Sequence, residues 1–169
     1  MANNNIYLIG FMGVGKSTIG KLLVEKTGGI LTEMDETIEK EQGISINEIF
    51  ATYGEQHFRD LESALLERIG HLSGQVVSCG GGAVLREQNV KSMKANGKII
   101  FLSATPETIY ERVRYSTNRP LLNGNMNVEY IAGLMEKRRA IYEAAADITI
   151  ATDGKEKKAI VDEIIERCE

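Results

Sequence analysis

The sequence has few of the residues that build disulfide frameworks and metal centres. It contains two cysteines, Cys79 and Cys168, two histidines and no tryptophan. The cysteines stand far apart and neither belongs to a Cys-x-x-Cys pair, which argues against a disulfide or a zinc site. Cys79 follows Val76, Val77 and Ser78, so we expect a small apolar residue at the end of a strand rather than a nucleophile.

Long apolar runs and an excess of positive charge are also missing. No window approaches the roughly 18 continuous apolar residues of a membrane span, and residues 1–5 lack the basic and apolar stretches of a signal peptide. The formal net charge is -4 and the isoelectric point is near 5.4, whereas nucleic-acid binding needs Lys and Arg to neutralise phosphates. We therefore expect a cytoplasmic protein with no membrane and no nucleic-acid partner.

Length and composition are typical of a single globular domain. The chain has 169 residues, of which 43% are hydrophobic and 26% are charged. Short runs rich in β-forming residues alternate with segments of helical period, which predicts a parallel sheet covered by helices on both faces. We expect a three-layer α/β/α fold over residues 1–169, with five strands at residues 6–9, 30–32, 76–78, 98–102 and 148–150.

Capping residues predict where several helices begin or end. These signals are Gly28 after residues 16–26, Ser45 with Glu48 before residues 46–53, Thr105 with Pro106 before a helix to about residue 114, and Asp153 with Glu156 before a last helix over residues 155–167. Apolar residues at helical spacing predict one more helix, whose buried stripe consists of Phe58, Leu61, Leu65, Ile69 and Leu72.

The segment between Tyr115 and Asn127 is polar, rich in turn-forming residues and longer than most connections. Arg119 stands in it, beside the rigid Pro120. A plain surface loop is one interpretation. The charge favours the other, a mobile lid over about residues 114–127 that closes over a ligand.

The strongest local signal is a glycine-rich loop between the first strand and the first helix. Residues 10–17 read Gly-Phe-Met-Gly-Val-Gly-Lys-Ser and fit the P-loop pattern G-x-x-x-x-G-K-[ST]. Such a loop turns backbone N–H groups towards a triphosphate, and the helix N-terminus adds partial positive charge. We expect Lys16 to bridge the β- and γ-phosphates of ATP and the Ser17 hydroxyl to bind Mg²⁺. The residues expected to contact the nucleotide here are Gly13, Val14, Gly15, Lys16, Ser17 and Thr18.

Nucleotide binding alone does not separate a kinase from a GTPase switch or a motor subunit. The sequence has no Asn-Lys-x-Asp element, which argues against guanine-specific GTPases, and it is short for a motor ATPase. A small-molecule kinase is the leading class. A noncatalytic nucleotide-binding switch is the alternative from outside the enzymes.

Two carboxylates, Glu33 and Asp35, follow the second expected strand. On an extended strand end their side chains point to the same side, and in a doubly wound sheet that end faces the P-loop crevice. One carboxylate can orient or deprotonate an acceptor hydroxyl while the other holds Mg²⁺ through water. An aspartate that caps a helix N-terminus is an equally good interpretation.

Two further motifs supply groups for an acceptor. Glu62 stands one helical turn after Arg59, where it can orient a guanidinium suited to a substrate carboxylate. Gly80, Gly81 and Gly82 end the third strand, and their bare backbone lets a ligand approach the N–H groups closely.

Together these motifs resemble the shikimate kinase family of P-loop folds. The resemblance covers nearly the whole chain, through the P-loop, the acid pair, G-E-x-x-F-R-x-x-E, G-G-G-A-V, R-P-L-L and a late M-x-K-R-x-x-x-Y. It implies a strand order of 2-3-1-4-5, a substrate-binding subdomain over about residues 33–62 and a lid over the nucleotide. It also implies ATP-dependent phosphorylation of shikimate at its 3-hydroxyl, in the pathway to chorismate and the aromatic amino acids.

The resemblance assigns the acceptor site to particular residues. It implies that Asp35 binds the ring hydroxyls, that Arg59 and Arg138 grip the carboxylate, and that the backbone around Gly81 contacts the substrate. Arg138 is favoured over Arg139 by the family's spacing to a later tyrosine, because adjacent helical residues point about 100° apart.

On the nucleotide side, the resemblance implies that Arg119 moves in with the lid to stabilise charge on the transferring phosphoryl group, and that Arg112 stacks near adenine. One departure concerns the metal: the family's common Asp-x-Asp is Glu33-Met34-Asp35 here, so the metal-side acid is one methylene longer. A kinase for another hydroxylated acid, of the gluconate type, is the nearest rival. No long exposed apolar stripe demands a dimer, so we expect a monomer.

Overall fold

The fold is built on a five-stranded parallel sheet. The computed structural model describes residues 4–114 and 127–168. Its strands are β1 (Asn5–Ile9), β2 (Ile30–Glu33), β3 (Gln75–Ser78), β4 (Gly97–Ser103) and β5 (Ile148–Ala151), in the order β2-β3-β1-β4-β5. Every neighbouring pair is parallel. The expected five strands and their order are therefore confirmed, with ends that differ by one residue.

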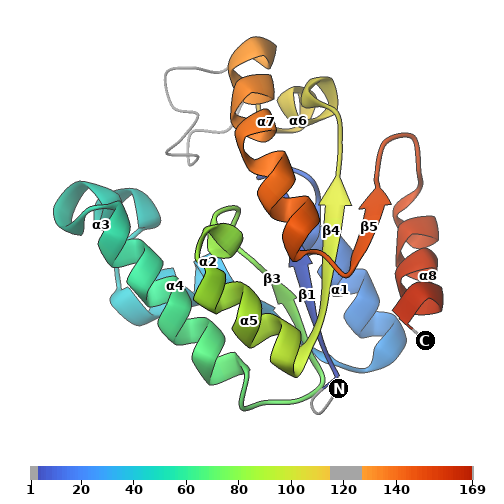
Figure 1. Ribbon diagram of the computed structural model, residues 1–169, viewed down its shortest axis with the longest axis horizontal. Helices are drawn as coiled ribbons and strands as arrows, with labels where there is room; N and C mark the ends of the chain where they lie inside the picture. Colours follow the sequence, from blue (N-terminus) through green and yellow to red (C-terminus); the bar gives the residue numbers. More distant parts are fainter. Residues whose placement is uncertain (1–3, 115–126, 169) are drawn as a thin grey trace.

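Helices cover both faces of this sheet (Figure 1). They are α1 (Lys16–Thr27), α2 (Met34–Gln42), α3 (Ile46–Tyr53), α4 (Glu55–Ile69), α5 (Glu87–Asn96), α6 (Pro106–Val113), α7 (Val128–Ala145) and α8 (Lys157–Cys168), with a short 3-10 helix at Ala83–Leu85. Side chains of α1 and α8 pack on one face, and side chains of α4 and α5 pack on the other. This arrangement is the expected three-layer α/β/α fold.

Two separate cores follow from the alternation of side chains along the central strands. Tyr7 and Ile9 of β1 belong to the core under α4 and α5, whereas Leu8 belongs to the core under α1 and α8. All three side chains are fully buried, because successive residues of a strand point to opposite faces and helices cover both faces. The carboxyl ends of the strands are left as the place where loops and polar side chains gather.

The capping signals at three helix ends are confirmed. Ser45 Oγ accepts a hydrogen bond from the Glu48 N–H at 3.1 Å at the start of α3. Thr105 Oγ1 accepts one from the Thr108 N–H at 3.2 Å at the start of α6. Helix α1 ends at Gly28, whose φ of 76° lies in the left-handed region that glycine adopts without strain.

The predicted capping box of the last helix is wrong. Asp153 Oδ1 instead accepts hydrogen bonds from the Thr105 N–H at 3.1 Å and the Thr108 hydroxyl at 2.8 Å. Burial alone would raise the pKa of Asp153, but these hydrogen bonds hold it below its usual value. Helix α8 begins at Lys157 rather than at residue 155. The Asp153 carboxylate thus binds residues that lie nearly fifty positions earlier in the chain. A local sequence pattern cannot reveal such a contact.

The predicted apolar stripe of α4 is correct except at its end. Phe58, Leu65 and Ile69 are buried, but Leu72 is 50% exposed. The helix stops at Ile69, before Gly70, so Leu72 no longer follows the helical period. Among the described residues, no helix is both long and apolar enough to cross a bilayer.

Two leucines of this stripe, one buried and one exposed, give a stability test. Leu65→Ala removes a side chain that is 4% exposed and should lower the free energy of unfolding by about 2 to 5 kcal/mol. Leu72→Ala makes the same chemical change at an exposed site and should stay within about 0.5 kcal/mol of wild type. Urea unfolding followed by circular dichroism measures both, and equal losses would contradict the burial described here.

Candidate active site

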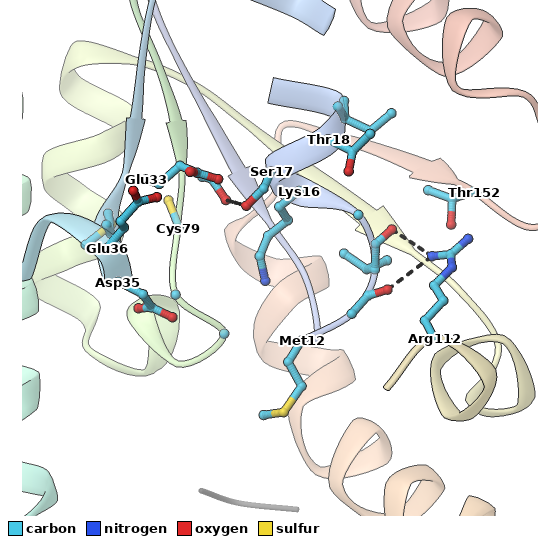
Figure 2. A pocket seen from close by; sticks show the side chains of 18 of the residues that line it. Met12, Lys16, Ser17, Thr18, Glu33, Asp35, Glu36, Cys79, Arg112 and Thr152 are labelled. Atoms are coloured by element: carbon cyan, nitrogen blue, oxygen red, sulfur yellow. Dashed lines mark hydrogen bonds between the residues drawn. The ribbon is translucent and has the colours of Figure 1, made fainter. Parts of the chain in front are cut away.

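A cleft of about 750 Å³ opens at the carboxyl ends of the strands. It is lined by the P-loop, by the β2–α2 junction, by the turn after β3 and by the segment after β5 (Figure 2). The residues from these segments include Gly13, Val14, Gly15, Lys16, Ser17, Thr18, Glu33, Asp35, Gly80, Gly81, Arg112, Thr152 and Lys155. Segments far apart in the sequence thus meet here, because parallel strands bring their carboxyl ends to the same edge of a sheet.

The P-loop connects β1 to the N-terminus of α1. Gly13 and Gly15 have φ angles of 83° and 108°, a left-handed conformation that favours glycine. Lys16 Nζ donates to the Gly10 carbonyl oxygen at 2.6 Å, so its ammonium group lies over the loop. Backbone N–H groups, a helix N-terminus and a lysine together form a cradle for phosphate groups.

The acid pair does not lie on one extended strand end, so that part of the prediction is wrong. Glu33 is the last residue of β2, whereas Asp35 is already in the first turn of α2. Figure 2 shows Glu33 beside Ser17, while Asp35 lies across the cleft from Arg112. A hydrogen bond from Ser17 lowers the pKa of Glu33 although the group is partly buried. The helix start separates the two acids into different parts of the cleft.

Neither acid serves α2 as a side-chain cap. Glu33 occupies the N-cap position, but its side chain accepts no capping hydrogen bond. Asp35 points at the glycine turn instead, since a Cβ added at Gly80 would lie 2.8 Å from its Oδ1. The exposed carboxylate of Asp35 therefore faces the glycine turn after β3.

A buried ion pair stands behind the glycine turn. Arg59 Nη1 donates to Glu62 Oε1 at 2.7 Å, and the Glu62 side chain is 0% exposed. Burial raises the pKa of Glu62 against the opposing attraction of Arg59. Glu62 Oε2 accepts no hydrogen bond from the described residues. The pair confirms that Glu62 orients the Arg59 guanidinium.

Each glycine of the turn after β3 lies close to a different side chain. A Cβ added at Gly80 would lie 2.6 Å from Glu62 Oε2, and one added at Gly82 would lie 2.6 Å from Arg59 Cζ. The Gly81 carbonyl oxygen accepts a hydrogen bond from the Tyr142 hydroxyl at 2.5 Å. Gly80 and Gly82 therefore leave no room for a side chain, whereas the nearest atom to a Cβ at Gly81 lies at 3.4 Å.

Helix α7 turns only one of its adjacent arginines towards this group. The Arg138 Nη1 atom would lie 3.4 Å from a Cβ added at Gly81, and its charge acts on Glu62 and Tyr142. Arg139 is instead ion-paired with Glu136 at 3.0 Å, with 59% of its side chain exposed. Arg59 and Arg138 thus both lie beside the same turn.

Sequence reasoning missed some contacts of the cleft. The bond from Tyr142 to Gly81 joins residues 61 positions apart, and no local pattern signals it. Thr152 also lines the cleft and has no motif of its own. Cys79 is buried and burial raises the pKa of its thiol to about 12, as expected of a residue without a nucleophilic role. Arg119 lies outside the described residues.

A P-loop cradle that shares its cleft with a separate acid, and with a glycine turn against which two arginines lie, is typical of the class of P-loop small-molecule kinases. The protein-family model of shikimate kinase matches residues 12–169. The chain is 48% identical over 163 residues to a shikimate kinase of Persephonella marina, an alignment that covers 96% of this chain and 98% of the relative. The chain therefore belongs to the shikimate kinase family.

Solved structures agree with this assignment. A shikimate kinase from Acinetobacter baumannii in complex with shikimate has a TM-score of 0.92 at 31% identity, covering 98% of this chain and 92% of that one. A shikimate kinase from Aquifex aeolicus has a TM-score of 0.83 at 37% identity, covering 96% and 94%. A gluconokinase from Sinorhizobium meliloti has a TM-score of 0.60 at 19% identity, which shows a shared fold alone.

The two acids that contact Arg59 provide a matched pair of variants. Glu62→Ala leaves a buried guanidinium without its buried partner and should lower the free energy of unfolding by about 3 to 5 kcal/mol. Glu55→Ala removes the other partner, at 3.3 Å and 51% exposed, and should cost less than about 1 kcal/mol. Urea unfolding at pH 7 compares them, and a Glu55 effect as large as that of Glu62 would contradict this account.

Proposed function

We propose that this cleft transfers the γ-phosphoryl group of ATP to the 3-hydroxyl of shikimate, giving shikimate 3-phosphate and ADP. The observation that carries the proposal is the turn after β3, whose Gly80 and Gly81 line the same cleft as Asp35 and the P-loop. Arg59 and Arg138 lie against this turn. Membership of the shikimate kinase family supports it. The cleft thus has one half for an acidic polyol and one half for a nucleotide.

The acceptor half suits a ring that carries one carboxylate and several hydroxyl groups. Arg59 and Arg138 bind the carboxylate, since a guanidinium makes charge-assisted and bidentate hydrogen bonds with it. Glu62 keeps Arg59 in one orientation. The backbone of Gly80, Gly81 and Gly82 lets the ring approach the turn closely. The substrate-binding subdomain over about residues 33–62 supplies Asp35 and Arg59 to this half.

Asp35 binds the ring hydroxyls and orients the 3-hydroxyl for attack. Its carboxylate is exposed in the cleft beside Gly80, within the half that the arginines define. A carboxylate at that place accepts the hydroxyl proton as the bond to phosphorus forms. Alignment of the attacking oxygen with the γ-phosphate provides most of the catalysis, because a loose phosphoryl-transfer transition state needs little covalent help.

The nucleotide half holds ATP by its phosphates. The N–H groups of Gly13, Val14 and Gly15 and of the first residues of α1, with Thr18 among them, surround the phosphate chain. Lys16 leaves the Gly10 carbonyl to bridge the β- and γ-phosphates. Arg112, which lines the cleft, stacks near adenine. Arg119, on a lid over about residues 114–127, stabilises charge on the transferring phosphoryl group.

Ser17 and Glu33 fit a Mg²⁺ ion on the phosphate chain. The Ser17 hydroxyl lies beside Glu33, whose pKa is lowered by their hydrogen bond, so the carboxylate stays ionised. Among the described residues, no cluster of three His, Cys, Asp or Glu side chains holds a metal by itself. Mg²⁺ binds at sites with few protein ligands, because it keeps several waters and takes phosphate oxygens as ligands. When bound, Mg²⁺ neutralises charge on the phosphates.

We also propose that the enzyme is a monomer.

A substrate panel tests the proposed reaction. ADP release with Mg²⁺-ATP should respond to shikimate and should stay at background with gluconate and nucleoside monophosphates, because gluconate has no ring and a nucleoside monophosphate has no carboxylate for the arginines. A coupled spectrophotometric assay measures it. A response to gluconate instead would favour the rival kinase, and silence with every acceptor would favour a nucleotide-binding switch.

Asp35→Asn should lower kcat by at least about 100-fold, because the amide no longer accepts the hydroxyl proton. Its affinity for ATP, measured by isothermal titration calorimetry, should stay near the wild-type value, since Asp35 lies in the other half of the cleft. Asp60→Asn is the matched control, because Asp60 is exposed and pairs with Arg86 at 2.8 Å. Normal turnover in Asp35→Asn would remove Asp35 from the mechanism.

A further inference from the structure

Arg112 projects from α6 and contacts the carbonyl side of the P-loop. Its Nη1 donates to the Val14 carbonyl oxygen at 2.8 Å and to the Gly13 carbonyl oxygen at 3.3 Å. Figure 2 shows both bonds, which end on the loop from the side of α6. A guanidinium bonded to two carbonyl oxygens makes charge-assisted hydrogen bonds, which are stronger than those between neutral groups. A cation from another helix therefore holds the loop.

These bonds determine the direction of a peptide plane in the cradle. In a trans peptide, the C=O and the N–H of the next residue lie in one plane and point in opposite directions. The Val14 carbonyl therefore shares its plane with the Gly15 N–H. When Arg112 holds that carbonyl outward, the Gly15 N–H points inward, to the side where a phosphate binds.

The neighbouring peptide plane is already fixed within the loop. The Gly13 carbonyl shares its plane with the Val14 N–H, and this N–H bonds to the Phe11 carbonyl oxygen at 3.2 Å. Among the described residues, neither the Val14 carbonyl nor the Gly15 N–H makes a backbone hydrogen bond within the loop that would fix the plane between them. Arg112 makes its shorter contact, 2.8 Å, to this second plane.

The glycines allow the P-loop to adopt its conformation but do not stabilise that conformation. Gly13 and Gly15 both have positive φ angles, and a residue without Cβ reaches many other conformations at little cost. Helix α6 also packs on the loop, since a Cβ added at Gly13 would lie 2.5 Å from Val113 Cγ1. The helix thus supports the loop through one packing contact and two hydrogen bonds.

We propose that Arg112 is a positioning residue of the phosphate cradle: by holding the Val14 carbonyl outward, it keeps the Gly15 N–H aimed at the phosphates. This role rests on the proposed function, in which the loop binds ATP, and is separate from a contact with adenine. The two roles differ in a measurable way. Contact with adenine affects only ligands that carry a base, whereas support of the cradle also affects the bare phosphate chain.

Tripolyphosphate with Mg²⁺ is the ligand that separates the two roles, because it has the phosphate chain of ATP and no base. Arg112→Ala should weaken the binding of tripolyphosphate and of ATP by about fivefold to tenfold each, the loss of charge-assisted hydrogen bonds that hold the cradle. Isothermal titration calorimetry measures both affinities. A loss confined to ATP would overturn the proposal and leave Arg112 with the base contact only.

Arg139→Ala is the control for charge. Arg139 is an exposed arginine paired with Glu136, so its removal changes the net charge equally without touching the P-loop. Both affinities should stay at the wild-type value in this variant. Thermal unfolding of the variants checks that they are folded.

A measurement without any ligand distinguishes support of the loop from simple attraction of an anion. In ¹⁵N-labelled protein, the amide order parameter of Gly15 should fall in Arg112→Ala and stay unchanged in Arg139→Ala. An Arg112 that acts only by attracting phosphate would leave the Gly15 amide as rigid as in wild type, which would overturn the proposal. This readout does not depend on turnover, so it decides the role of Arg112 even if the substrate panel rejects shikimate.

Discussion

The buried pair of Arg59 and Glu62 is the interaction on which the acceptor half of the cleft depends. A charge removed from water is stable only beside a partner with good geometry, so α4 must present both side chains at one place behind the turn after β3. The turn after β3 has to leave room for these two side chains, because a Cβ at Gly80 or Gly82 would collide with them. This ion pair thus explains why Gly80 and Gly82 carry no side chain.

The other groups of the acceptor half lie around the same pair. Glu62 lies near enough for the charges of Asp35 and Arg138 to act on it, and Tyr142 joins α7 to the Gly81 carbonyl. The acceptor half is therefore assembled from α2, α4, α7 and the turn after β3. The nucleotide half is assembled from α1 and α6, which meet at the P-loop. The two halves meet in one cleft at the edge of the sheet.

The sheet and its helices alone do not choose the reaction. The gluconokinase of Sinorhizobium meliloti has a similar fold at 19% identity, as expected when one fold carries several acceptor sites. Differences in substrate must then come from the side chains gathered around the carboxyl ends of the strands. In this chain those side chains are two arginines and an aspartate around a glycine turn, a set with the charge and shape for a hydroxylated acid.

The sequence by itself determined the order of the elements, the P-loop and three of the helix caps, because period, glycine position and capping pairs act over a few residues. It also indicated the pairing of Arg59 with Glu62, since one helical turn separates them. The partners of Asp153 and the contact between Tyr142 and Gly81 were decided only by the tertiary structure. So were the helical position of Asp35, the exposure of Leu72 and the hold of Arg112 on the P-loop. These features depend on where each helix of the 169-residue chain begins and ends and on which distant segments meet. Both are determined by packing over the whole fold.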